Sequence, residues 1–140
     1  MPISATHSSS AELGKLVLRA TLAILILLHG IAKLSNGVDF ISGMLERIGM
    51  PSSFAYLVFI GEVLAPILVL IGLWTRPAAL VIAINMLVAI WLVHMGELFQ
   101  LSKTGGWALE LQGMFLFSAI AVALLGAGRY SVGGSGGKWN

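Results

Sequence analysis

The chain has 140 residues, of which 58% are hydrophobic and 10% are charged, with eight bases against six acids. Soluble domains carry about 25% charged residues, so this composition predicts a one-domain integral membrane protein. The few bases form no stripe that would bind nucleic acid. The absence of cysteine excludes thiol exchange, iron-sulfur clusters and thiolate zinc sites within this chain alone.

The two ends of the chain differ in composition from the part between them. Residues 1–13 are polar and serine-rich and lack a basic cluster, which predicts a flexible tail in which His7 has no role. Residues 131–140, SVGGSGGKWN, are glycine-rich and are expected to be flexible as well. The membrane domain is therefore predicted at 14–130.

The first apolar segment, 16–34, ends in LLHGIAKL. No small-residue cleavage site follows it, so a retained helix is favoured over a removed signal peptide. His29 and Lys33 lie four residues apart on one helical face, and Gly30 leaves a shallow place beside them. Each side chain has an ordinary alternative, because His29 is also explained as a core residue and Lys33 as a base that extends to the membrane surface.

Residues 35–53 connect the first two spans. Apolar residues recur there at helical spacing, and they are Val38, Ile41, Met44, Leu45 and Ile48. This pattern predicts a short helix that lies in the membrane interface.

The second span, 54–73, carries Glu62 near its middle. Twenty residues of helix extend about 30 Å, the thickness of the hydrocarbon core, and an acid at that depth costs roughly 2.5 to 3.5 kcal/mol. Such a residue is therefore expected to have a partner and a function, although a buried structural acid is the alternative. Pro66 cannot donate to the carbonyl of Glu62, which predicts a distorted helix there, and Gly61 allows close approach.

The third span, 78–95, contains Asn85 and His94, and the fourth, 106–125, contains Glu110 and Gln112. Nine residues separate Asn85 from His94, which places them on opposite helical faces, so they cannot share a site unless the helix is distorted. Gln112 is interpreted as an interhelical hydrogen-bonding residue. The predicted fold is an all-α transmembrane four-helix bundle with a short interfacial helix between spans one and two.

Basic residues predict the orientation in the membrane. Five lie on the side of the termini, namely Lys15, Arg19, Arg76, Arg129 and Lys138. Three lie on the other side, namely Lys33, Arg47 and Lys103. Because bases are retained in the cytoplasm, both termini are predicted to be cytoplasmic.

This orientation places polar residues from all four spans in the outer half of the bundle. We expect Glu62, His29 and Lys33 to be catalytic, and we expect a wider ligand-binding set, namely His29, Gly30, Lys33, Gly61, Glu62, His94 and Glu110. A metal site of His29, His94 and either Glu62 or Glu110 is not favoured, because no span contains an HxxxH pair.

The segments LLHGIAKL, FIGEVLAPILVLIGLWTRPAA, GGWALE and GAGRYS together resemble the DoxX family of small bacterial membrane proteins over residues 13–132. The resemblance implies a four-helix protein of the bacterial inner membrane. Some relatives are tied to thiosulfate oxidation coupled to quinone, and others to oxidoreductase complexes that handle thiols or oxidative stress. The residues of this chain that carry the resemblance are His29, Gly30, Lys33, Gly61, Glu62, Gly105, Gly106 and Arg129. Many members have Glu where this chain has Ala108, and here the acid is Glu110.

The leading hypothesis is a redox-associated membrane subunit that binds a quinone-like or other small polar ligand and passes protons. The electrons would come from the bound molecule or from a membrane or extracytoplasmic oxidoreductase partner, because no flavin, haem or nucleotide motif is present. The alternatives are a proton-coupled small-molecule transporter and a non-catalytic assembly subunit. Small residues in the spans suit close packing within one copy or between copies, so a homo-oligomer fits as well as a monomer.

Overall fold

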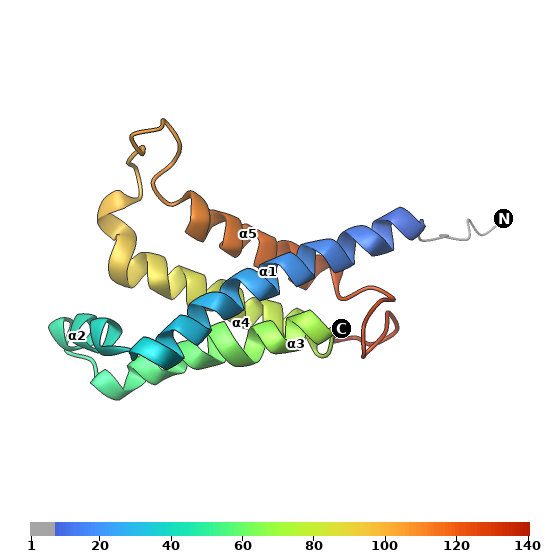
Figure 1. The fold of residues 1–140 in the computed structure, drawn as a ribbon, viewed down its shortest axis with the longest axis horizontal. Coiled ribbons are helices and arrows are strands. Elements are labelled where there is room, and N and C mark those ends of the chain that lie inside the picture. The colour runs from blue at the N-terminus through green and yellow to red at the C-terminus, as the bar shows by residue number, and fades with distance from the viewer. Residues whose placement is uncertain (1–7) are drawn as a thin grey trace.

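The computed structural model describes residues 8–140. Within this range the regular structure is helical apart from one isolated β-bridge between Leu101 and Trp107. The long helices run along the length of the molecule, with the start of α1 and the C-terminus toward one end and α2 at the other (Figure 1). The predicted all-α bundle, with a short helix between the first two spans, is confirmed.

Two of the spans consist of several helical pieces. The first span is the single helix α1, Ser9–Asn36, and the short helix α2 is Asp39–Arg47. The second span joins a 3-10 helix, a π-helix and an α-helix, namely η1 Ser52–Leu57, η2 Ile60–Leu64 and α3 Ala65–Ile71. The third joins α4 Thr75–Ala89, the π-helix η3 Ile90–His94 and the 3-10 helix η4 Met95–Glu97. The fourth is α5, Glu110–Leu125.

Three stretches are long and apolar enough to cross a membrane, namely Ser9–Asn36, Ser52–Ile71 and Thr75–Glu97. Helix α5 has 16 residues, or about 24 Å, and is apolar but shorter. It begins four residues later than the sequence predicts. Trp107 explains this difference, because its indole N–H donates to the carbonyl of Leu98 at 2.8 Å and its ring packs against Gly113. Residues 106–109 therefore close the preceding loop and do not extend the helix.

The four spans form a closed ring in which α1 packs against α3 and α5, and α4 packs against the same two helices. Small side chains lie at these contacts, with Ala23, Ala65, Ala79, Ala83 and Ala119 all buried. Apolar side chains gain little from leaving lipid, so close backbone approach and dispersion contacts stabilise the ring.

Helix α2 covers the end of the bundle opposite the termini. Val38 and Leu45 are buried against Ala55 of η1, while Asp39, Glu46 and Arg47 are exposed. The predicted apolar stripe thus faces the second span over most of its length, although Ile48 at its end is 46% exposed. An amphipathic helix at this place suits the boundary between lipid and water.

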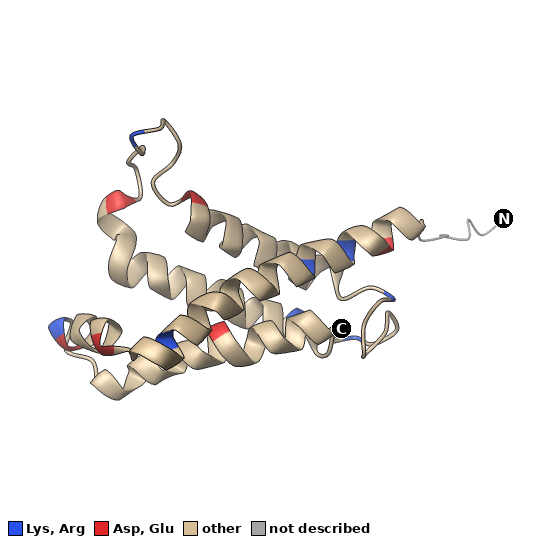
Figure 2. Cartoon of the chain, viewed as in Figure 1, with Lys and Arg blue, Asp and Glu red and all other residues tan. Residues whose placement is uncertain are grey.

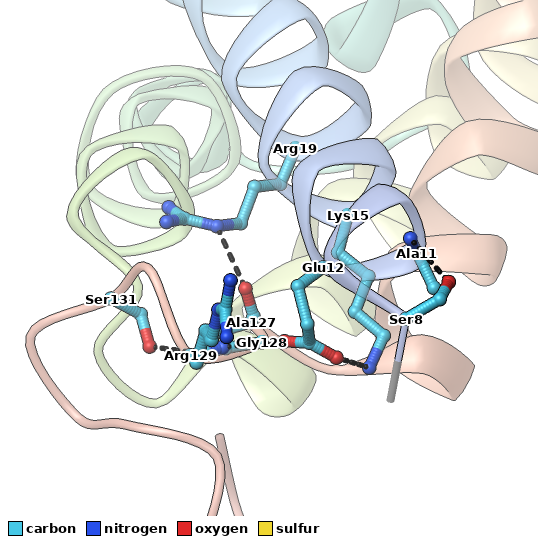
Figure 3. A network of polar contacts seen from close by, with 9 residues as sticks. All are labelled: Ser8, Ala11, Glu12, Lys15, Arg19, Ala127, Gly128, Arg129 and Ser131. Carbon is cyan, nitrogen blue, oxygen red and sulfur yellow. Dashed lines mark hydrogen bonds and ion pairs between the residues drawn. The ribbon is translucent and has the colours of Figure 1, made fainter. Parts of the chain in front are cut away.

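Arg19 joins three parts of the chain at the end of the bundle near the termini. It is 1% exposed, and its guanidinium donates to the carbonyls of Val69, Leu70, Ala127 and Tyr130. The first two carbonyls belong to the last turn of α3, where the carbonyl of Val69 also accepts from the main-chain N–H of Gly72 at 3.2 Å. Figure 3 shows Arg19 extending from α1 toward Ala127. The sequence indicates Arg19 only as a topology signal.

The last residues of the chain pack against the turn between α3 and α4. Val132 and Gly133 donate main-chain N–H groups to the carbonyls of Ile71 and Gly72, at 3.0 and 2.9 Å. Asn140 is buried, and its side-chain carbonyl accepts from the hydroxyl of Thr75 at 2.8 Å. The glycine-rich composition of 131–140 contains no sign of these contacts, and the flexibility of this tail remains a prediction.

Candidate functional site

Glu62 lies in the π-helix η2, at the point where the sequence predicts a disturbed helix. The main-chain N–H of Ala65 donates to the carbonyl of Ile60, five residues earlier, and Pro66 then stands at the start of α3. A proline lacks the N–H that an α-helix needs at this place, and a wider turn accommodates that loss. Segments of π-helix are rare and frequently occur at functional sites.

The carboxylate of Glu62 has partners on both neighbouring spans. Its Oε2 lies 2.5 Å from the ammonium of Lys33, and its Oε1 accepts a hydrogen bond from the amide of Asn85 at 3.3 Å. The Glu62 side chain is 6% exposed and the Lys33 side chain 28%. The membrane-embedded acid is therefore paired, and its base remains accessible from one side.

Two glycines bring the backbones close enough for these contacts. A Cβ atom on Gly30 would clash with the carbonyl group of Glu62 and would lie 2.8 Å from Cγ2 of Val63. A Cβ atom on Gly61 would lie 2.6 Å from the Cβ and Cγ atoms of Asn85. The role of these two glycines is to allow close packing of the helices that carry the site, and they provide no side chain to it.

His94 reaches the same region because the third span is distorted. It is the last residue of η3, so the turn that carries it is wider than an α-helical turn. One ring nitrogen lies 2.9 Å from the carboxylate of Glu97, and the other lies 3.2 Å from the side-chain amide of Gln112 on α5. His94 lines a cavity with Glu62, and Asn85 contacts Glu62 without lining that cavity. The sequence allows Asn85 and His94 to reach one site only if the helix is distorted, and η3 is such a distortion.

A cavity of about 160 Å³ lies between these side chains. Its polar lining comes from His29, Lys33, Glu62, His94 and Gln112, and part of its apolar lining comes from Ile26, Met86 and Phe115. The ring of His29 meets that of Phe115 edge to face, with centroids 5.8 Å apart. Since one water takes about 30 Å³ of liquid, the space suits about five waters or one small ring.

The structure brings together four of the predicted catalytic and ligand-binding residues, namely His29, Lys33, Glu62 and His94. Glu110 is not among them. It is exposed at the start of α5, and its carboxylate lies against Gly106 at the mouth of the preceding loop. Gln112 takes its place two residues later, on the face that points inward, because successive helical residues differ by about 100°.

Two residues of the site are missing from the set that the sequence predicts. Gln112 bonds between helices as expected, through His94, but it also lines the cavity. Asn85 is absent from the predicted set because, on a straight helix, it would lie on the face opposite His94. A polar side chain within an apolar span is the signal for both, since such a group must find a partner inside the bundle.

The arrangement offers donors and acceptors around a space with apolar walls. Lys33 and Gln112 can donate hydrogen bonds, Glu62 can accept them, and the two imidazoles can do either. Within residues 8–140, no three His, Asp or Glu side chains gather as a metal ligand set. The site is therefore suited to a small polar or ring-containing ligand and to proton transfer.

Comparison with known proteins gives one family and one curated relative. The DoxX family model matches residues 14–95, which hold His29, Lys33, Glu62 and His94. The relative is a Bacillus subtilis (strain 168) protein named "Putative oxidoreductase CatD", 29% identical over 120 residues. The match covers 86% of this chain and 84% of the relative. No solved structure matches the chain.

Proposed function

Because the chain belongs to the DoxX family, we propose that it is a membrane subunit of a redox system, with the cavity between the spans as the site for a quinone headgroup or a similar small ligand. The observation that carries this proposal is the paired acid inside the bundle. Glu62 and Lys33 lie 2.5 Å apart and line the same cavity as two histidines. Ionisable groups inside a membrane domain are costly, so their gathering around a space favours function over packing.

The chemistry of a quinone fits this lining. Its two ring oxygens accept hydrogen bonds, and reduction to the quinol takes up two electrons and two protons. Lys33 or a protonated imidazole would donate to a ring oxygen, and Glu62 would pass protons because its carboxylate can gain and lose one. The electrons would come from a partner oxidoreductase, in keeping with the name of the relative from Bacillus subtilis.

The same residues could also form a proton-coupled transport site, since a membrane-embedded acid paired with a base can bind a proton in place of a substrate. A quinone ligand is preferred because the cavity is small and has apolar walls on Ile26, Met86 and Phe115.

We propose that the protein lies in the bacterial inner membrane and that both of its termini are in the cytoplasm. Figure 2 shows most charged residues toward the two ends of the bundle. The excess of bases at the end near the termini supports this orientation. A C-terminal reporter that is active only outside the cytoplasm should stay inactive. An active reporter would contradict this topology and would mean that the cavity lies in the inner half of the membrane.

The test of the proposed function is the quinone that co-purifies with the chain. The protein would be extracted from its native membrane with mild detergent, and the bound quinone would be measured by mass spectrometry. We expect His29→Ala to lose the quinone while it keeps the parent melting temperature, because the His29 side chain is exposed and its edge-to-face contact with Phe115 is worth only about 1 kcal/mol.

Leu28→Ala is the matched control, because Leu28 is exposed on the neighbouring position of the same helix and lies outside the cavity lining. It should retain the quinone. A stable His29→Ala protein that binds as much quinone as the parent would contradict the assignment. Substrate movement into liposomes by a protein without quinone would favour transport.

A further inference from the structure

A second cavity, of about 240 Å³, lies at the end of the bundle near the termini. It is formed where the start of α1, the start of α4 and the segment after α5 meet. Its charged lining consists of three bases, Lys15, Arg76 and Arg129, and one acid, Glu12. Figure 3 shows Glu12, Lys15 and Arg129 gathered beside the main chain of Gly128. The proposed quinone site has no share in this cavity.

Two nitrogens of the Arg76 guanidinium donate hydrogen bonds to the chain, and the third bonds to no acceptor among the described residues. Its Nη1 donates to the carbonyls of Ala123 and Leu124 at 2.8 and 2.7 Å, and its Nε donates to the terminal main-chain oxygen of Asn140 at 3.3 Å. Among residues 8–140, no acceptor is bonded to its Nη2. The arginine therefore presents a fixed donor to the cavity.

Arg129 is placed in a similar way. Its Nη2 donates to the hydroxyl of Tyr130 at 2.6 Å and to that of Ser9 at 3.3 Å, while its Nε and Nη1 bond to no acceptor in the described part of the chain. Its main-chain N–H donates to the carboxylate of Glu12 at 2.7 Å. The segment that carries Arg129 is thus fastened to α1 by the backbone, and its side chain keeps donors for another molecule.

The acid in this cavity is already engaged. The ammonium of Lys15 lies 2.7 Å from Oε1 of Glu12, and the N–H of Arg129 binds the other oxygen. Glu12 is 3% exposed, so it balances one positive charge from a buried position. Two further basic side chains remain around the space, namely Arg129 and Arg76, of which Arg76 also donates to the terminal main-chain oxygen of Asn140.

We infer that this cavity binds a phosphate group, carried by an anionic lipid headgroup or by a soluble phosphate compound. Three bases from three segments surround the space, and arginine donors match the oxygens of a phosphate. The site lies at the end of the membrane bundle, the level at which lipid headgroups lie, and basic pockets there are typical of anionic lipid sites. A neutral or cationic ligand would leave the excess charge unbalanced.

The test compares lipids and phosphate on the full-length protein in detergent. Native mass spectrometry would count bound phosphatidylglycerol, phosphatidylcholine and inorganic phosphate on the parent and on Lys15→Gln/Arg129→Gln. Arg76 is left unchanged, because it also fastens α5. The control, Arg47→Gln/Lys103→Gln, removes two exposed bases at the opposite end of the bundle. Melting temperatures confirm that each variant is folded.

We expect the parent to retain phosphatidylglycerol and not phosphatidylcholine, with the Lys15/Arg129 variant about 30-fold weaker and the control unchanged. Inorganic phosphate bound by the parent without phosphatidylglycerol, and lost in the same variant, would support the inference with a soluble phosphate as the source. Equal phosphatidylglycerol binding by all three proteins, or no anion bound by the parent, would overturn it. If the double variant melts early, Lys15→Gln alone gives the same comparison, with a smaller expected loss.

Discussion

Two buried charged side chains, Arg19 and Glu62, are paired in different ways. Near the termini, Arg19 is 1% exposed and all four of its acceptors are main-chain carbonyls. In the other half, Glu62 is 5% exposed and its partners are the side chains of Lys33 and Asn85. The first arrangement ties segments of chain together, and the second surrounds a cavity.

The difference lies in what the partners can do. A main-chain carbonyl cannot change its charge, and an arginine keeps its proton at any physiological pH, so the Arg19 contacts are permanent. A carboxylate, an imidazole and an ammonium can exchange protons with a ligand. Burial of a charge is therefore a weak sign of function by itself, and the chemical nature of its partners is the stronger sign.

The largest effect is expected from Arg19→Met. This change keeps a long side chain but removes the guanidinium donors from carbonyls of α3 and of the segment after α5, at a cost of about 3 to 5 kcal/mol in unfolding free energy. Thermal melting in detergent measures it. Arg47→Met, at an exposed position of α2, should melt like the parent. If both variants melt alike, Arg19 does not hold the end of the bundle together.

Next in size is Gly30→Ala, which separates close packing from helix propensity. The added methyl group would clash with the main chain of Glu62 and should lower stability by roughly 1 to 3 kcal/mol and weaken ligand binding. Gly14→Ala on the same helix has nothing within 4 Å and should be neutral or stabilising, by up to about 1 kcal/mol. Equal melting temperatures for the two variants would show that α1 moves away easily.

The Lys33–Glu62 pair is expected to have a smaller but coupled effect. Lys33→Met leaves a buried carboxylate with only an amide partner, so it should destabilise more than the double variant Lys33→Met/Glu62→Gln does. We expect a coupling free energy of about 1 to 3 kcal/mol from the double-mutant cycle, measured by melting at neutral pH. Additive losses would mean that the two groups act separately.

The smallest change in stability is expected for Glu62→Gln, because an amide keeps the shape and the hydrogen bond from Asn85 can remain. Its effect should appear in the pH profile. If Glu62 carries protons, the variant should fold and bind ligand while the pH dependence of activity disappears. An active variant with the pH profile of the parent would exclude Glu62 as the proton carrier.

The sequence predicts much of the fold, because a membrane span is a matter of length and apolar composition. It also locates Glu62, Lys33 and His29, since charged or titratable groups within apolar segments are conspicuous. The place of His94 in the cavity lining could not be predicted, because it depends on the π-helical turn η3, and apolar composition contains no signal for such a turn. The role of Arg19 was hidden because its four acceptors are main-chain carbonyls, which every residue has.

The π-helices η2 and η3 also bear on which deletions the gene can tolerate. A single π turn holds one residue more than the α-helix around it, so removing one residue there restores an α-helix and leaves the remainder of the span unrotated. One residue removed elsewhere in a span turns the rest of that span by about 100°, which moves its buried side chains out of the core. Within the spans, a scan of single-codon deletions should therefore find Ile90–His94 the most tolerant place, with a folded chain and a displaced His94. A deletion in Ile60–Leu64 should be less tolerated, because it returns Pro66 to an α-helical turn that needs its missing N–H.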